Sequence, residues 1–419
     1  MTTAVPDAAQ SLCSLLDMVR SGSAVTRPEL AQQSGLGRRL ITQRLNDLIE
    51  LGLVEEGELA ASTGGRAART LRFRTEAGRL LVAELGSSSL GVGIADLGGN
   101  MLTHREAPTA FDRGPDEVLS QVEQLFEELL ATQPSDAPPV WGIGIGVLGP
   151  VDARTGCPMP VNLFPGWGGY PVRDRLSTRY DVPVWVDNEV NLMALGEYHR
   201  RLPRRTQNLA YLKIGTGIGA GLISDGRLLR GFSGSAGQIG HVSVVDDPET
   251  VCWCGSTGCL VLFAGGRALS ETATELARSG RSDLLARRLE ERGVLSAQDI
   301  SDGAQSGDPE CSALLIRTGK LIGKALATLV NVANPELVLI GGSVADTGET
   351  LLAGIREEVY RLSFPPASHH LSIVHSTLIE QAGLIGAADM VVDELLSLSV
   401  LPRWIDSGSP AGRATRIHG

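Results

Sequence analysis

Lysine, aromatic residues and long apolar runs are scarce in this chain of 419 residues. Only Lys213, Lys320 and Lys324 occur, so arginine carries nearly all of the positive charge, and aromatic residues make up 4%. No run of 18 apolar residues is present, which excludes a conventional membrane-spanning helix. The start, MTTAVPDAAQ, lacks the basic and apolar parts of a secretory signal, so we expect reduced cysteines and a cytoplasmic setting.

The charge is acidic overall but unevenly distributed. A formal net charge of −11 argues against a protein that coats nucleic acid. Residues 1–79 carry ten arginines and nine acidic residues, whereas the remainder carries 27 basic and 39 acidic residues. A length of 419 residues predicts two or three domains. A nearly neutral first domain on an acidic body is compatible with one small module that contacts DNA.

Three of the six cysteines lie within eight residues of one another. Cys252, Cys254 and Cys259 follow His241 in the order His-x10-Cys-x-Cys-x4-Cys. Three thiolates and one imidazole complete a tetrahedral coordination of Zn²⁺ and leave no position open for water. The spacing therefore predicts a structural zinc site rather than a catalytic one, and we prefer it to chance cysteines beside a core histidine.

Residues 1–78 carry the pattern of a winged helix-turn-helix domain. A first helix is predicted over residues 7–20. Thr26 is placed to cap a second helix, with Pro28 and Glu29 in its first turn. A glycine-containing turn leads to a third helix from residue 38 to Gly52. The next residues, to about 73, read as two strands joined by a loop, which is the wing.

The third predicted helix has an apolar face and a polar face. Its period places Ile41, Leu45, Leu48 and Ile49 on the buried side. Arginine, glutamine and asparagine side chains on the other side suit base edges in a major groove, and arginines on a flexible wing suit phosphates or a narrow minor groove. The candidate DNA-binding residues are Arg38, Arg39, Thr42, Gln43, Asn46, Arg66 and Arg69. A small helical dimerisation domain is the alternative interpretation.

From residue 79 onward strands alternate with helices, which predicts an α/β body. Two halves open in a similar way, so we expect a duplicated fold with a ligand cleft between the halves. The first lobe is predicted over residues 79–200, with a helix at 380–398 packing back on it. The second lobe is predicted over residues 201–379 and carries the zinc loop. The polar, Pro/Gly-rich tail at 400–419 is expected to be disordered.

Five motifs of the body resemble those of the ROK family of repressors, uncharacterised reading frames and sugar kinases. They are GIGIGVLGPVD, VDNEVNLMALGE, KIGTGIGAGLI, GSAGQIGH and CWCGSTGCL, and the resemblance covers most of residues 80–395. It implies an actin-like ATPase (ribonuclease H-like) fold. With the first domain, it implies a sugar-responsive transcriptional regulator, a repressor rather than an activator, of carbohydrate uptake or catabolism genes. The expected partners are a double-stranded DNA operator, a sugar or sugar-derivative effector, and further copies of the chain in a homodimer or homotetramer.

The resemblance also implies where the effector binds. The family's sugar-contacting and catalytic Asn-Asp pair corresponds to Asn188 and Glu189, although Asn188 has a second interpretation as the cap of the following helix. The family's Glu-x-Gly-His corresponds to the run from Gln238 to His241, and that histidine contacts both zinc and sugar. Asn162 lies in a further segment that resembles a sugar-contacting one.

Several family positions carry different residues in this chain. Glu189 is one methylene longer than the family aspartate, and Val261 stands in place of a glutamate. Residues 84–88, ELGSS, replace the Asp-x-Gly-Gly-Thr of kinases, while the second phosphate loop, residues 215–217, is intact. Phosphoryl transfer depends on accurate placement of a base and of phosphate donors. We therefore expect no catalytic residue and altered sugar binding. An ATP-dependent sugar kinase with an added DNA-binding domain, and a DNA-binding protein without a ligand, are the alternatives.

Overall fold

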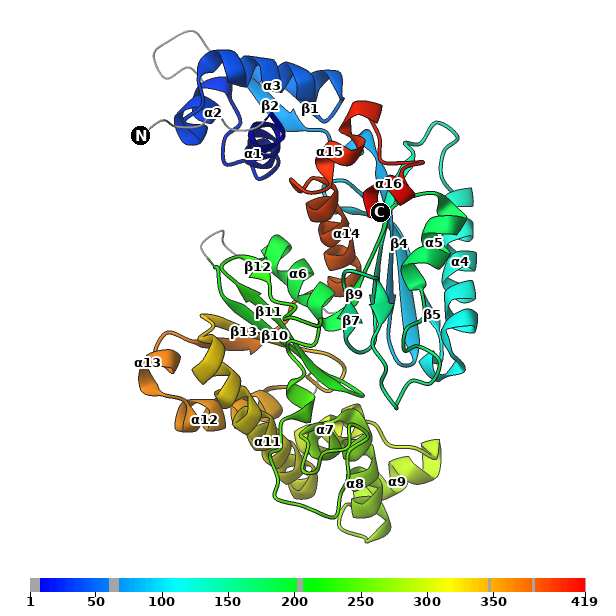
Figure 1. Ribbon diagram of the computed structural model, residues 1–419. Coiled ribbons are helices and arrows are strands. Elements are labelled where there is room, and N and C mark those ends of the chain that lie inside the picture. The colour runs from blue at the N-terminus through cyan, green and yellow to red at the C-terminus, as the bar shows by residue number, and fades with distance from the viewer. Residues whose placement is uncertain (1–7, 60–67, 202–205, 346–347, 379–380, 419) are drawn as a thin grey trace.

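The computed structural model describes residues 8–59, 68–201, 206–345, 348–378 and 381–418. A small N-terminal module lies at one end of the molecule, and two α/β lobes make up the body (Figure 1). Among the described helices, none combines the length and apolar character needed to cross a membrane.

The described residues of the N-terminal module form three helices and two antiparallel strands. They are α1 (Ala8–Arg20), α2 (Arg27–Ser34), α3 (Arg38–Glu50), β1 (Val54–Leu59) and β2 (Arg69–Phe73). The Thr26 hydroxyl accepts a hydrogen bond from the backbone N–H of Glu29 at 3.4 Å, as its capping role predicts, and the Glu29 carboxylate reaches back to the N–H of Val25 at 2.8 Å. Gly35, with φ +66°, ends α2 in the left-handed conformation that glycine adopts most easily.

Lobe 1 is built on a five-stranded sheet. Its strands are β3 (Arg79–Leu85), β4 (Ser89–Asp96), β5 (Met101–Pro108), β6 (Val140–Val147) and β9 (Val184–Asn188). Their order is β5-β4-β3-β6-β9, with an antiparallel meander from β3 to β5 and with β6 and β9 parallel to β3 and β6 respectively. The helices α4 (Pro115–Ala131) and α5 (Val172–Tyr180) pack on this sheet, and a small hairpin, β7 (Val151–Asp152) and β8 (Cys157–Pro158), adjoins it.

Lobe 2 repeats the same topology. Its strands are β10 (Leu209–Ile214), β11 (Ile218–Ser224), β12 (Arg227–Leu228), β13 (Leu337–Gly341) and β14 (Ser372–His375), in the order β12-β11-β10-β13-β14. Here too the first three strands are antiparallel and the last two are parallel. The predicted duplication is therefore confirmed.

Lobe 2 has a helical insertion between β12 and β13. Five consecutive helices occupy it, namely α7 (Val261–Ala264), α8 (Gly266–Arg278), α9 (Asp283–Arg292), α10 (Ala297–Gln305) and α11 (Pro309–Ala333). The helices α12 (Glu349–Leu362) and α13 (Pro365–Ser368) follow β13. The long α11 packs against α12 and shares the buried apolar cluster of this lobe.

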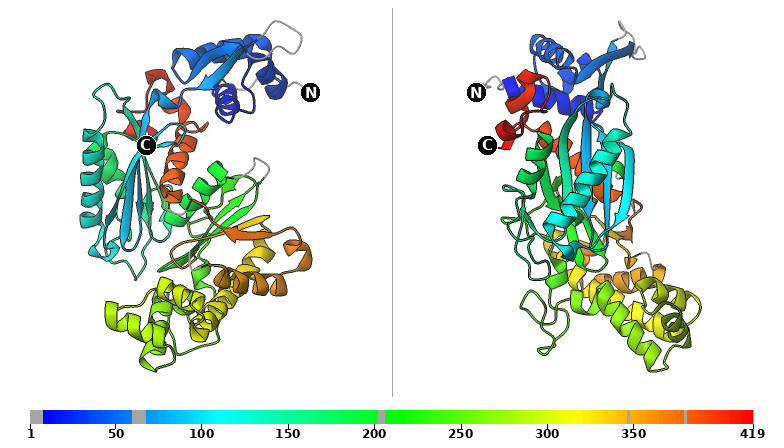
Figure 2. Two further views of the ribbon diagram at one scale, coloured as in Figure 1. Left: turned by 180° about the vertical axis from the view of Figure 1, so that it is seen from behind. Right: turned by 90° about the vertical axis from the view of Figure 1, so that its right-hand side faces the viewer.

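Two helices cross between the lobes. α6 (Glu189–Arg201) follows the last strand of lobe 1 and packs on β10 and β11, whereas α14 (Ala382–Leu395) follows the last strand of lobe 2 and packs on β3 and β6 (Figures 1 and 2). The two helices also pack on each other. A Cβ at Gly196 would lie 2.2 Å from the carbonyl oxygen of Ala382, and one at Gly386 would lie 1.7 Å from that of Leu192. Their backbones are thus in direct contact.

The expectation of a disordered tail is wrong for residues 400–418. This segment forms α15 (Leu401–Trp404) and α16 (Ala414–His418) against lobe 1 (Figure 2). The buried Trp404 packs edge-to-face on Trp141 at 5.4 Å between ring centroids, and its Nε1 donates to the carbonyl of Leu395. His418 Nε2 accepts a hydrogen bond from the N–H of Val184 at 2.9 Å. A few large buried side chains hold a segment whose average composition is polar.

Candidate functional site

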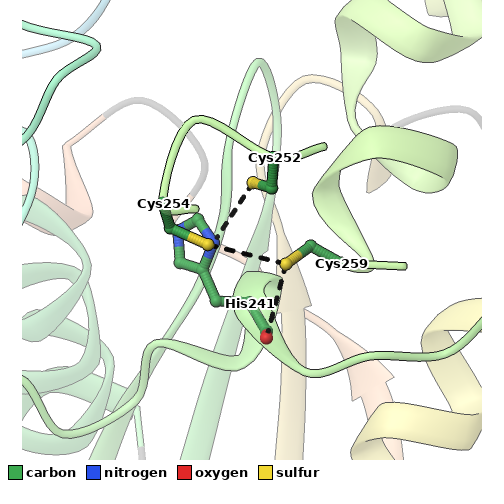
Figure 3. Close-up of side chains that lie close together, drawn as sticks. All are labelled: His241, Cys252, Cys254 and Cys259. Atoms are coloured by element: carbon green, nitrogen blue, oxygen red, sulfur yellow. Dashed lines mark hydrogen bonds between the residues drawn. The ribbon is translucent and has the colours of Figure 1, made fainter. Parts of the chain in front are cut away.

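The predicted metal ligands converge in lobe 2. His241 ends a short 3-10 turn after β12, and the three cysteines lie on the loop that follows (Figure 3). All four donor atoms lie within 4.8 Å of one another. The Sγ atoms of Cys254 and Cys259 are 3.7 Å apart, as are Cys252 Sγ and His241 Nδ1. The clustering of these four residues is confirmed.

Two of the donor-to-donor distances, both 3.7 Å, match those around a tetrahedral metal ion. Donors held about 2.0–2.3 Å from a central Zn²⁺ are separated by about 3.5–3.8 Å from one another. Burial and the neighbouring Cys254 and Cys252 together raise the pKa of the Cys259 thiol to about 12. Burial lowers the pKa of His241, which favours the neutral imidazole that binds metals. With Nδ1 turned toward the cysteines, Nε2 is the nitrogen left for another ligand.

Asn188 and Glu189 lie where β9 passes into α6, between the lobes. The side chain of Asn188 is engaged at both ends: Nδ2 donates to the carbonyl of Gly149 at 2.7 Å, and Oδ1 accepts from the N–H of Val190 at 2.9 Å. The capping interpretation of Asn188 therefore describes its contacts in this structure. One N–H of its amide remains for another acceptor.

Glu189 is bound to a lysine that sequence reasoning missed. Lys213 Nζ lies 2.6 Å from Glu189 Oε2, with 19% of the lysine side chain and 6% of the glutamate side chain exposed. Burial raises the pKa of Glu189, while Lys213 opposes that rise. The signal was available, because Lys213 is the single charged residue of the otherwise apolar strand β10 and lies just before the intact phosphate loop, with Ile214 between them.

Glu84 is a second carboxyl near this ion pair. Burial raises its pKa to about 7, and Lys213 partly offsets that effect. Glu84 packs against Gly383 at the start of α14, where an added Cβ would lie 2.0 Å from its Oε2. At neutral pH its charge is therefore only partly developed.

A second ion pair joins the lobes beneath Asn188. Arg230, which follows β12, places Nε 2.5 Å from Asp187 Oδ2. The buried Asp187 also accepts hydrogen bonds from the N–H of Asn188 and from Asn191 Nδ2, both at 2.7 Å. Asp187 thus fixes the turn between β9 and α6 and ties it to lobe 2.

The two loops that resemble kinase phosphate loops touch each other. Ser87 Oγ, from lobe 1, lies 3.1 Å from Thr216 Oγ1, from lobe 2. In this arrangement the two hydroxyl groups are within hydrogen-bond distance of each other, one from each lobe. The contact was not foreseen, because it joins residues 129 positions apart in the chain.

The remaining predicted effector residues lie around the zinc loop. Asn162 is exposed, and its Nδ2 donates to the carbonyl of Trp253 at 3.3 Å. The indole of Trp253 packs edge-on against His241 at 4.3 Å between ring centroids. Gln238 is half-buried, and its amide forms no hydrogen bond with another described residue. Val261 begins α7 and brings no polar atom to this region.

The predicted DNA-binding residues of α3 share one exposed face. That face forms no hydrogen bond or ion pair within the described residues, and it consists of Arg38, Arg39, Thr42, Gln43 and Asn46. On β2, the exposed Arg69 donates to the carbonyl of Gly57 at 3.3 Å. Arg66 lies outside the described residues.

A three-helix module with an exposed polar face on α3 is joined to a duplicated α/β body that carries a His-Cys₃ cluster. These features define the class of this protein: a small module appended to an actin-like, sugar-kinase-type body. The particular family follows from comparison. The ROK family model matches residues 81–394, and the chain belongs to that family.

Relatives of two kinds resemble the chain. A xylose repressor from Caldicellulosiruptor bescii is 29% identical over 91% of this chain and 95% of its own length. A glucokinase from Halalkalibacterium halodurans is 30% identical over 74% of this chain and 93% of its own length. Among solved structures, a ROK family transcriptional regulator, a homologue of the E. coli MLC protein, is 26% identical, with a TM-score of 0.82 over 96% of this chain and 99% of that one.

Proposed function

We propose that this chain is a sugar-responsive transcriptional repressor whose body has lost kinase activity. The observation that carries the proposal is the extent of the two similarities. The repressor similarity extends over the N-terminal module, whereas the glucokinase similarity spans nearly all of the kinase but only three quarters of this chain. The additional quarter is what a DNA-binding regulator needs and a kinase does not.

The N-terminal module supports this function through the face of α3. Five exposed polar side chains, with no hydrogen bond or ion pair to another described side chain, lie on a helix whose opposite side is buried. Such a helix, in a winged helix-turn-helix, lies in the major groove and reads base edges with its exposed residues. A homodimer would present two such helices to a pseudo-palindromic operator.

The cleft supports the loss of phosphoryl transfer. A catalytic base must accept a proton from the attacking hydroxyl, and Glu189, at the base position, is already bound to Lys213. The facing phosphate loops bond to each other through Ser87 and Thr216. Since phosphoryl transfer relies almost wholly on positioning and charge stabilisation, both contacts oppose it.

We infer that the same cleft binds a sugar effector. Asn188, Glu189, Gln238 and His241 would offer amide, carboxylate and imidazole groups to hydroxyls, with Asn162 at the opening. These are the polar groups that carbohydrate hydroxyls need as partners. Zn²⁺ bound by His241, Cys252, Cys254 and Cys259 would be structural, since four protein donors complete its coordination. It would hold the histidine ring in place beside the effector.

Two assays on the purified full-length chain test the proposal. DNA binding is measured with duplexes selected from a random library, alone and with D-xylose, D-glucose and N-acetylglucosamine. Specific binding that a sugar weakens is the expected result, and no selected duplex after several rounds would contradict it. Coupled ADP release with ATP and the same sugars tests the alternative of a sugar kinase, which the intact loop at 215–217 favours. Turnover near 1 s⁻¹ or faster, on the order of ordinary kinases, would establish that alternative.

A further inference from the structure

A cluster of charged side chains lies far from the zinc loop, where the N-terminal module meets the body. Arg20, in the last turn of α1, places Nη2 2.7 Å from Oδ1 of Asp393 on α14. His199, near the end of α6, places Nε2 3.4 Å from the other oxygen of the same carboxylate. Arg200 approaches Asp389, one turn earlier on α14, at 3.8 Å. One carboxylate therefore contacts the module and α6 at the same time.

The contact between Arg20 and Asp393 has no counterpart across this boundary. Within the described residues it is the sole ion pair that joins residues 8–73 to the body. The rest of the boundary is apolar: α1 lies against α15, and Leu12, Leu16, Leu401 and Trp404 belong to one buried cluster (Figures 1 and 2). Apolar burial is non-directional. The ion pair between Arg20 and Asp393, at 2.7 Å, adds a charged contact at one defined point of α1.

The helix that carries His199 begins between the lobes, at one of the proposed effector contacts. Glu189 is the first residue of α6 and His199 is ten residues further on, a distance of about 15 Å along a helix. Because a helix of this length is stiff, a displacement of its first residue also moves its last turn. Gly196 and Gly386 each contact the backbone of the facing helix, so α6 and α14 are closely packed. A displacement of one helix therefore displaces the other.

The far end of α6 is also fixed to lobe 2. The buried Glu197 carboxylate accepts hydrogen bonds from the hydroxyl of Ser376 and from the N–H groups of Thr377 and Leu378, at 3.1 and 3.0 Å. These residues lie between β14 and α14. A change in the angle between the lobes therefore reaches the segment that carries Asp393 as well as the helix that carries His199.

We propose that Arg20, Asp393 and His199 form the contact through which the cleft sets the position of the N-terminal module. The inference rests on the proposed function and adds the route by which effector binding would reach the DNA-binding module. The route runs from the effector contacts along α6 to the shared carboxylate of Asp393, and from there to α1. His199 and Arg20 are positioning residues, since neither lies at the cleft or on the exposed face of α3. The route couples the two sites only if the effector binds the two arrangements of α6 with different affinity.

The pair also has a matched protonation state. Burial alone would lower the pKa of His199, but its hydrogen bond to Asp393 and the nearby Asp389 raise it above its ordinary value. Burial would raise the pKa of Asp393, whereas His199 and Arg20 lower it. Each partner stabilises the charged form of the other, as expected for a specific contact rather than a chance approach.

The first test measures the docking of α1 in the full-length protein without DNA or sugar. Asp393→Asn and His199→Gln are compared with wild type by hydrogen exchange over residues 8–20. The matched control is Glu128→Gln, which breaks an ion pair with Arg105 on the surface of lobe 1. We expect faster exchange of α1 in Asp393→Asn and wild-type exchange in the control. Unchanged exchange in Asp393→Asn would overturn the inference, whatever the chain binds.

The second test measures the response to sugar with a duplex selected by the wild type. In Asp393→Asn and Arg20→Met we expect DNA affinity without sugar to stay close to wild type, because the face of α3 is intact. Allosteric effectors typically change an affinity by about 5–150-fold. In these variants the factor by which sugar lowers DNA affinity should be smaller than in the wild type and close to one. Variants that respond as the wild type does would overturn this inference alone. If wild type binds the duplex but no sugar of the panel alters binding, the inference falls together with the effector half of the proposed function.

Discussion

Replacing Lys213 by methionine tests whether the carboxylate at the family's base position is held by an ion pair. The substitution keeps the length and the apolar part of the side chain and removes the ammonium that lies 2.6 Å from Glu189. At that distance and an effective dielectric constant of about 20, the gross attraction is about 6 kcal/mol, most of which offsets the desolvation of two buried charges. Removing one partner from a buried pair costs about 3–5 kcal/mol, because the other charge stays buried and unpaired.

The loss of folding stability in Lys213→Met should depend on pH, and the structure predicts the direction of that dependence. Without Lys213, burial raises the pKa of Glu189 in the folded chain further above its value in the unfolded chain. Stability of Lys213→Met is then greatest at low pH and falls as pH rises through the folded pKa. We expect a loss of about 3 kcal/mol in the free energy of unfolding at pH 8 and a much smaller loss at pH 5.

Urea unfolding followed by tryptophan fluorescence measures this loss, since all five tryptophans lie in the body. The matched control is Lys320→Met, which breaks an exposed pair with Glu357 and should cost at most about 1 kcal/mol. The double variant Lys213→Met, Glu189→Gln removes both charges and should recover most of the loss. Equal losses in the two lysine variants, or additivity within about 0.5 kcal/mol in the double-mutant cycle, would refute the reasoning.

Three further predictions concern the other parts of the chain. Arg39→Ala and Gln43→Ala should each weaken binding to a selected duplex by about 1–3 kcal/mol and relax its sequence preference, as gel-shift titration can measure; an unchanged preference would place the reading face elsewhere. Removal of zinc by a chelator should speed hydrogen exchange in residues 242–260, and metal analysis that finds no zinc in the purified protein would contradict the site. Burial raises the pKa of Asp389 to about 7, so wild-type stability should fall as pH rises from about 4 to 7, and Asp389→Asn should gain in melting temperature relative to wild type over that window.

Local patterns in the sequence predicted what is local in the structure. The cap at Thr26, the helix from Arg38 and the similar opening of the two halves all follow from spacing and period, which report on residues close in the chain. The metal cluster was also predictable, because its ligands lie within 19 residues and only a few residue types bind zinc.

The contacts between the two lobes were not predictable in the same way. Lys213 meets Glu189 because α6 leaves lobe 1 and packs on β10 of lobe 2, and no pattern within either segment specifies that crossing. The prediction of a disordered tail was wrong for a related reason. The average polarity of residues 400–418 indicates disorder. The order of this segment depends instead on Trp404 and His418, which both contact buried partners in lobe 1.

The cross-lobe contacts also explain why a sugar could act as a signal in this chain. Lys213 with Glu189, Ser87 with Thr216, and Asn162 with Trp253 each join a group of one lobe, or of its crossing helix, to lobe 2. A sugar that hydrogen-bonds to these groups competes with contacts that hold the lobes at their present angle. It therefore favours a different angle and has unequal affinity for the two arrangements, which is the condition for coupling. In a kinase the corresponding groups would serve ATP and the reacting hydroxyl. Under the proposed function, Glu189 paired with Lys213 instead provides a contact that a ligand can break.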